Sequence, residues 1–148
     1  MSTTDPAADD IREHFQRVSR RMRRAMMAAL EPCGVSPHQA RALRTVIDAG
    51  ELRPSQLAES LGIALRSTTQ VVDDLVAAGL LSRRPDPSDR RAVLVSATEA
   101  GHQLAARIAE IRSQQSRQFA SVLSAQDRTE LRRILVLLED ALAQAPEG

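Results

Sequence analysis

The sequence RRPDPSDRRAVLVS at residues 83–96 decides the fold of this chain. Two short runs, residues 80–84 and 92–96, have the length and composition of β-strands. The segment between them, Asp86 to Asp89, is rich in residues that favour tight turns. We therefore expect a β-hairpin, and the two arginines that begin its second strand place positive charge near its tip.

Two short helices are expected directly before this hairpin. Pro54 opens the first and Gly62 closes it, and the second runs from about Leu65 to Gly79. The turn between them, residues 62–64, contains glycine, as a helix-turn-helix requires. A helix-turn-helix followed by a cationic hairpin is the outline of a winged-helix DNA-binding lobe. In such a lobe the second helix suits the major groove and the hairpin suits the minor groove.

Longer amphipathic helices flank this lobe. Apolar residues recur three or four positions apart in residues 8–34, from Thr98 to about Leu123, and again after Ser124. In the helix that begins at Thr98, we expect an exposed apolar stripe of Leu104, Ile108, Ile111 and Phe119. The lobe cannot cover all of these apolar faces, so a second copy related by a two-fold axis is the simplest partner.

These patterns predict a mainly α, α+β fold: a winged helix-turn-helix with additional N- and C-terminal helices that form a dimerisation domain. The 148 residues fit one main core, and only 1% of them are aromatic, so aliphatic side chains must build it. We expect a disordered tail at residues 1–7, a helical dimerisation region at 8–34 and 98–145, and the DNA-binding lobe at 35–97.

Charge and composition limit the function. All 20 basic side chains are arginine, and 19 acidic residues leave a net charge of +1, so nucleic-acid binding must come from a local patch. No apolar run approaches a bilayer span, the acidic N-terminus lacks a signal-peptide core, and the one cysteine cannot form an internal disulfide. We therefore expect a cytoplasmic protein without a membrane partner. No catalytic triad order, glycine-rich phosphate loop or paired-carboxylate cleft is evident, so we expect neither an enzyme nor a cofactor or metal.

The start of the second lobe helix carries the candidate reading residues for the major groove. Serine and threonine can contact bases or phosphates, glutamine can bind adenine, and a free helix N-terminus attracts phosphate. The candidates are Arg66, Ser67, Thr68, Thr69 and Gln70. Solvated first-turn side chains are the plainer interpretation of this segment taken alone.

The hairpin supplies the candidates for the minor groove: Arg84, Asp89, Arg90 and Arg91. Asp89 lies two residues before Arg91, on the same strand face, and can hold its guanidinium for insertion into a narrow groove. A surface ion pair without a DNA role is the alternative. Asp73 and Asp74 should face away from the duplex or pair with arginine, because acids repel phosphate. Phosphate neutralisation then falls to Arg53, Arg83, Arg84, Arg90 and Arg91.

At this point the chain resembles the MarR family of bacterial transcription regulators over nearly its whole length. The segments that carry the resemblance are residues 36–43, 57–59, 67–75, 79–81 and, above all, 86–91 leading into 93–101. The resemblance implies an obligate homodimer whose two lobes bind a pseudo-palindromic operator in double-stranded DNA, and we expect a repressor. It places residues 67–70 in the major-groove reader and Asp89 and Arg91 in the wing. Arg53 stands where a Ser or Thr helix cap is common, so we expect that cap to be lost.

The resemblance also implies an effector pocket where the dimerisation helices meet the lobe. Small aromatic or phenolic acids are common effectors in the family. An arginine would bind the carboxylate and apolar side chains would line the slot, with Arg17, Met26 and Arg41 as candidates.

Other functions remain open from the sequence. A winged helix can serve as a protein–protein module without DNA affinity. A redox-responsive regulator would use Cys33, although it lies after the first helix and no tyrosine accompanies it. A metal-responsive regulator would use some of His14, His38, His102, Cys33 and Glu99, although no two histidines have helical i, i+4 spacing.

Overall fold

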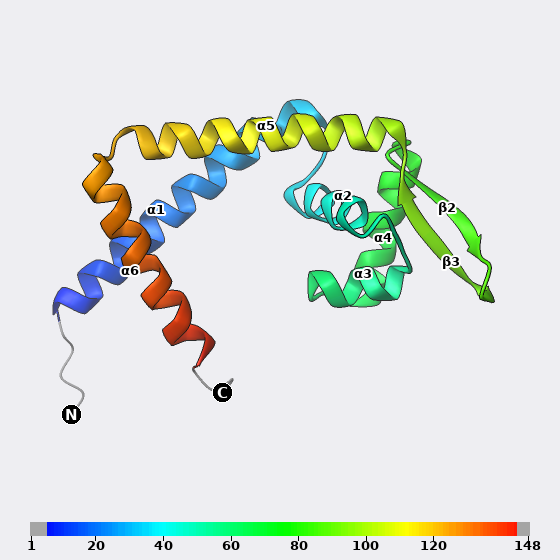
Figure 1. The fold of residues 1–148 in the computed structure, drawn as a ribbon, viewed down its shortest axis with the longest axis horizontal. Coiled ribbons are helices and arrows are strands. Elements are labelled where there is room, and N and C mark those ends of the chain that lie inside the picture. The colour runs from blue at the N-terminus through cyan, green and yellow to red at the C-terminus, as the bar shows by residue number, and fades with distance from the viewer. Residues whose placement is uncertain (1–5, 145–148) are drawn as a thin grey trace. The chain divides into compact units, whose positions relative to one another are not determined.

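A computed structural model describes residues 6–144 of the chain. The chain forms two compact units that divide after Arg112. The elements are α1 (Pro6–Leu30), a short 3₁₀ helix η1 (Glu31–Cys33), α2 (Pro37–Ala49), β1 (Glu51–Leu52), α3 (Pro54–Leu61), α4 (Leu65–Ala77), β2 (Leu81–Asp86), β3 (Asp89–Ala97), α5 (Glu99–Ser121) and α6 (Ala125–Ala143) (Figure 1). The predicted mainly α, α+β winged-helix fold with additional N- and C-terminal helices is confirmed.

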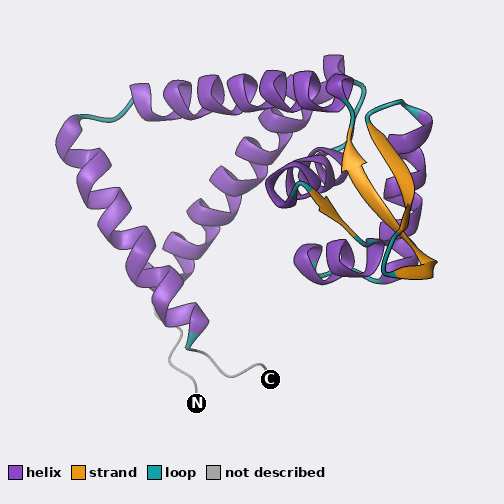
Figure 2. Cartoon of the chain, turned by 45° about the vertical axis from the view of Figure 1, so that its right-hand side comes forward, coloured by secondary structure: helices purple, strands orange, loops and turns teal. Residues whose placement is uncertain are grey.

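The predicted hairpin is formed by β2 and β3, which pair antiparallel from Leu81 opposite Ala97 to Pro85 opposite Val93 and, after a register shift, at Asp86 opposite Asp89 (Figure 2). Both strands extend closer to the tip than predicted, so only Pro87 and Ser88 separate them. The short strand β1, which was not predicted, pairs with the other edge of β3 and gives the order β1-β3-β2. β3 is therefore held on both sides, and the hairpin has a fixed base.

The core of the first unit fixes α4 against the rest of the lobe. Leu43, Val46, Leu57, Val72 and Val95 are fully buried, and they come from α2, α3, α4 and β3. Spacings of three on α2 place Leu43 and Val46 on one face, as an amphipathic helix requires. The opposite side of α4 is left free to carry polar residues.

The start of α5 is locked to the end of α4. The Thr98 hydroxyl donates to the Gly79 carbonyl at 2.6 Å and accepts the Gly101 N–H at 3.1 Å. The Thr98 N–H donates to the Leu80 carbonyl at 3.1 Å. Gly101 is buried here, and a Cβ at this position would lie 2.2 Å from the Leu80 carbonyl oxygen. Gly79 adopts φ +74°, as predicted for a left-handed helix cap.

Three sequence-based expectations about the flanking helices are corrected. α1 begins at Pro6, so residues 6 and 7 are helical, while residues 1–5 of the expected tail lie outside the described residues. α1 ends at Leu30, and η1 follows it. The apolar stripe of α5 is exposed only in part: Ile108 is 4% exposed because it packs with Leu30 and Ala40, Leu104 and Ile111 are partly buried against the same cluster, and Phe119 is exposed as expected.

Each unit nevertheless has an exposed apolar face. In the first unit, α1 exposes Ile11, Phe15, Val18 and Met22. In the second unit, α6 starts at the predicted capping box of Ser124 and Asp127 and exposes Ile134, Leu135, Val136, Leu137, Leu138 and Leu142. Within residues 6–144, no helix combines the length and the apolar character needed to cross a bilayer.

Candidate DNA-binding surface

The N-terminus of α4 is an uncapped helix end. Its N-cap residue is Ala64, which has no side-chain group to bond the first amides. The first helical hydrogen bond runs from the Thr68 N–H to the Ala64 carbonyl at 3.0 Å, so the amides of residues 65–67 have no helical acceptor. Such an end favours an anionic group, and a DNA phosphate satisfies that preference.

Thr68 does not belong to the exposed residues predicted to contact DNA bases. Its side chain is completely buried, and its hydroxyl donates to the Ala64 carbonyl at 3.2 Å. Thr68 lies four residues before Val72 and seven before Leu75, both of which are buried, so it belongs to the core-facing side of α4. That spacing was visible in the sequence. Arg66, Ser67, Thr69 and Gln70 are exposed.

Two of the exposed reading candidates already have partners within the lobe. The Thr69 hydroxyl donates to the Leu65 carbonyl at 2.9 Å, and the Gln70 amide donates to Asp74 at 2.9 Å. Gln39 of α2 also reaches Asp74, at 3.5 Å. A bidentate contact from Gln70 to adenine therefore requires release from Asp74. The groups that donate to Asp74 are thus the side-chain amides of Gln39 and Gln70, and the expected alternative of an arginine partner is not formed.

Asp86 anchors the tip of the hairpin to the start of α3, a role that the sequence analysis missed. Arg53, the N-cap residue of α3, donates to Asp86 from Nε at 2.7 Å and from Nη2 at 2.6 Å. The Ser88 hydroxyl and amide also donate to Asp86, at 2.7 and 2.8 Å. Bonds from Ser88 first, and then from Arg53, lower the pKa of Asp86 to about 2. No sequence pattern indicates that Arg53 and Asp86, which are 33 positions apart, are in contact.

This arrangement changes the role of Arg53. It was expected to neutralise phosphate, but its guanidinium is committed to Asp86 and also donates to Ser88 at 3.2 Å. The predicted loss of a side-chain cap at this position is confirmed. The Arg53 N–H instead receives a cap from Gln56, whose side-chain oxygen accepts at 2.8 Å.

Two further arginines that were expected to contact phosphate face carboxylates. Arg84 forms a bidentate pair with Glu51 of β1, with both N–O distances at 2.5 Å, and this hydrogen bonding lowers the pKa of Glu51. Arg83 pairs with Asp73 of α4, as predicted for that acid. Arg53, Arg83 and Arg84 thus stabilise the lobe, and their charge is largely balanced in place.

Three arginines of the candidate surface have no carboxylate partner within residues 6–144: Arg66, Arg90 and Arg91. All three are exposed. The predicted contact between the Asp89 carboxylate and the Arg91 guanidinium is not formed. Asp89 instead accepts the backbone N–H of Arg91 at 3.0 Å, which shapes the start of β3 and leaves the guanidinium free.

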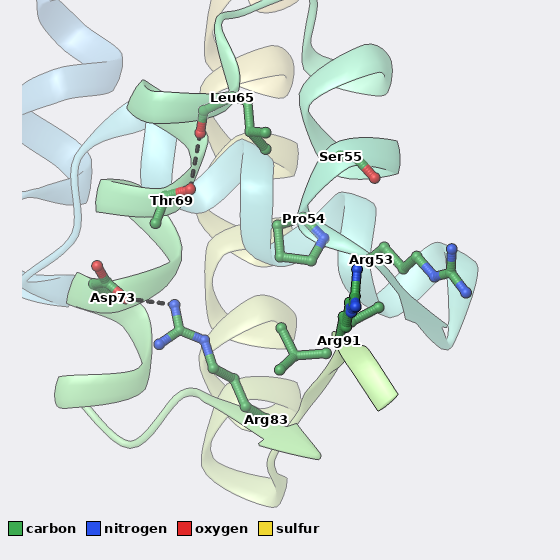
Figure 3. Close-up of a pocket in the computed structure, with 10 residues that line it drawn as sticks. Arg53, Pro54, Ser55, Leu65, Thr69, Asp73, Arg83 and Arg91 are labelled. Atoms are coloured by element: carbon green, nitrogen blue, oxygen red, sulfur yellow. Dashed lines mark hydrogen bonds and ion pairs between the residues drawn. The ribbon is translucent and has the colours of Figure 1, made fainter. Parts of the chain in front are cut away.

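An open hollow of about 530 Å³ lies between α4, the start of α3 and the hairpin. Figure 3 shows Leu65 and Thr69 of α4 on one side and Pro54 and Arg53 on the other. Its lining residues are Arg53, Pro54, Ser55, Leu65, Thr69, Asp73, Arg83, Arg91, Ala92 and Val93. The lining therefore combines apolar side chains with Asp73 and three arginines, of which Arg53 and Arg83 are paired with carboxylates.

The predicted effector residues have different surroundings. Arg17 pairs with Glu13 on α1 at 2.6 Å, Met26 packs against the buried cluster around Leu30, and Arg41 is exposed. A separate hollow of about 280 Å³ lies between α2 and α5. Its lining residues are Ala40, Arg44, Ile47, Asp48, Ala105, Ile108, Ala109 and Arg112.

Neither alternative sensor chemistry gains support from the geometry. Cys33 is half-buried in η1 and packs at the edge of the Leu30 cluster. Among the residues that the structure describes, no group of three or more histidine, cysteine or acidic side chains is placed to hold a metal ion.

A helix-turn-helix with a hairpin wing and an arginine-bearing surface defines a winged-helix DNA-binding lobe. A family model described as "MarR family" matches residues 34–92. A Mycobacterium tuberculosis HTH-type transcriptional regulator is 30% identical over 112 residues, which cover 76% of this chain and 78% of the relative. The chain belongs to the MarR family of transcriptional regulators, which are non-enzymatic DNA-binding proteins.

Other relatives match over a shorter part. The HTH-type transcriptional repressor MdtR of Bacillus subtilis is 28% identical over 68% of this chain, and the match spans 65% of MdtR. Among solved structures, YusO of Bacillus subtilis matches with a TM-score of 0.82 and 24% identity, covering 95% of this chain and 99% of YusO. A mutant of MarR from E. coli, complexed with operator DNA, matches with a TM-score of 0.72 and 24% identity, covering 91% and 99%.

Proposed function

We propose that this protein is a homodimeric repressor that binds an inverted-repeat operator in double-stranded DNA through α4 and the β2–β3 wing. The observation that carries this proposal is a set of exposed arginines without a carboxylate partner among residues 6–144, Arg66 in the first turn of α4 and Arg90 and Arg91 at the start of β3, together with the uncapped start of α4. On a lobe where the other nearby arginines face acids, these cations are the ones available to phosphate and to the minor groove. The operator-bound MarR structure supports the same use of this fold.

The exposed apolar faces of α1 and α6 support the proposed dimer. Phe15 and Val18 on α1 and Leu137 and Leu142 on α6 are each more than two-fifths exposed. Contiguous apolar faces of this kind mark protein interfaces, and a two-fold axis buries the same patch on both copies. A dimer would also present two α4 helices about one helical turn apart, roughly 34–36 Å, to successive major grooves.

The test is selection of bound duplexes from a randomised pool by the full-length protein, followed by affinity measurements at several salt concentrations. We expect an enriched inverted repeat. For Arg91→Ala we expect weaker binding and a slope of log K against log salt that is smaller by about one unit per lost phosphate contact. Arg107→Ala, which removes an exposed arginine from α5, is the matched control and should bind as the unaltered protein does.

The outcomes separate the proposed function from its rival. Failure to enrich any duplex at low salt would contradict DNA binding and favour a protein–protein module. An enriched site without inverted symmetry would contradict the dimeric mode of reading.

Release by a small aromatic or phenolic acid is part of the proposal. The hollow between α2 and α5 offers apolar walls from Ala40, Ile47 and Ile108 beside Arg112, which can bind a carboxylate on an apolar body, whereas Arg44 is paired with Asp48 at 3.5 Å. A thermal-shift screen of phenolic acids tests this part. An unchanged melting temperature with every acid would remove the effector from the proposal and leave DNA binding intact.

A further inference from the structure

We infer that Leu65 is a specificity-determining residue that recognises the C5-methyl group of thymine in the major groove. This inference rests on the proposed function and deepens it. Leu65 is the first residue of α4, and 52% of it is exposed even though it is a large apolar side chain. On the proposed docking face, this position lies at the helix end that contacts base edges.

Leu65 belongs to an apolar surface and is not an isolated exposed leucine. Val93 of β3 is 39% exposed and lines the same open hollow, together with Pro54 and Ala92. The lining of that hollow also includes Arg91, whose guanidinium has no carboxylate partner within residues 6–144. Apolar side chains beside an unpaired arginine match the edge of a duplex, where apolar base groups lie inside a line of phosphates.

Three of the polar side chains near Leu65 are already buried or hydrogen-bonded within the lobe. Thr68 is buried, the Thr69 hydroxyl is bonded to the Leu65 carbonyl, and the Gln70 amide is bonded to Asp74. Only Arg66 and Ser67 remain exposed in this turn without such a bond. Base recognition by the start of α4 therefore depends more on apolar contact than the threonine- and glutamine-containing sequence suggests.

Thymine is the base whose major-groove edge fits an exposed leucine side chain. Its C5-methyl is the apolar group that the four bases present in the major groove, whereas the other base-edge features there are hydrogen-bond donors and acceptors. Contact with this methyl removes exposed surface of Leu65 from water without breaking the Thr69 or Gln70 bonds.

The test uses the duplex that the full-length protein itself enriches, with each thymine replaced in turn by deoxyuridine, which lacks only the methyl group. We expect one thymine per half-site at which deoxyuridine weakens binding about four-fold, the effect of burying one methyl group. Leu65→Ala and Leu65→Asn should bind the thymine and deoxyuridine duplexes equally. Arg90→Ala should weaken binding to both duplexes by the same factor and keep the methyl effect.

Two results overturn the inference while leaving the proposed function standing. One is an equal loss of affinity on deoxyuridine substitution in the unaltered protein and in both Leu65 variants, because another residue would then contact the methyl group. The other is an enriched operator with no thymine whose methyl affects binding. Failure to enrich any duplex instead refutes the proposed function, and this inference with it. Melting curves of the Leu65 variants establish that they remain folded.

Discussion

Replacing Gly101 with alanine should destabilise the protein, although alanine is the better helix former. In an unobstructed helix interior, glycine to alanine stabilises by about 1 kcal/mol. Here the added Cβ would lie 2.2 Å from the Leu80 carbonyl oxygen and 3.3 Å from Leu43 Cδ1. The first contact is more than 1 Å closer than an ordinary van der Waals contact, and the obstructing atom is backbone, which cannot rotate away.

Relief of this clash requires the first turn of α5 to move away from Leu80. That movement stretches the Thr98 bonds to Leu80 at 3.1 Å and to Gly79 at 2.6 Å. Overpacking of this kind costs about 1–3 kcal/mol, so the expected sign is opposite to helix propensity.

Urea denaturation of the variant, monitored by circular dichroism, measures this free energy of unfolding. Ala106→Gly, at an exposed position of the same helix, is the control for propensity and should cost about 1 kcal/mol. Stabilisation by Gly101→Ala would refute the close approach of α5 to Leu80.

Three further predictions follow from other parts of the lobe. Leu43→Ala removes a fully buried side chain and should lower the free energy of unfolding by about 2–5 kcal/mol, measured by urea denaturation; a loss below 1 kcal/mol would contradict the core described above. The pKa of Asp86 is lowered to about 2, so its ionised form stabilises the fold above the ordinary pKa near 4, and this contribution is lost as pH falls toward 2. Asp86→Asn should therefore flatten the fall in melting temperature between pH 4 and pH 2, and an unchanged profile would contradict the anchoring role. Asp73→Asn frees Arg83 and should strengthen DNA binding and steepen its salt dependence, measured by fluorescence anisotropy; weaker binding would show that the pair positions the wing.

Local sequence signals predicted most of the fold. Gly62 and Gly79 take the positive φ angles that helix ends require, and the turn residues 86–89 joined two strands as expected. These features depend on a few neighbouring residues, so the sequence carries them directly. β1 was missed because two residues are too short for a strand pattern, and they become a strand only when β3 supplies their partner.

The candidate surface was predicted less completely, since its electrostatics depend on contacts distant in sequence. The exposure of Arg66, Arg90 and Arg91 agrees with their expected role, but composition cannot show that Arg53 and Arg84 are held by Asp86 and Glu51. Each of those pairs joins residues 33 positions apart. The burial of Thr68 was a local fact, available from its spacing to Val72, and it was overlooked because threonine is polar.

The bond between Arg53 and Asp86 has a consequence for the DNA. It fastens the tip of the wing to the helix-turn-helix at α3, and β3 beyond Arg91 is held by β2 and, at Val95 and Ser96, also by β1. Under the proposed function, a lobe built in this way cannot adjust the wing to each duplex, so the duplex must supply the flexibility. The protein would then prefer operators whose base steps bend easily, or whose minor groove narrows easily, at positions that no side chain touches. The mechanical properties of the operator would thus become part of its recognition.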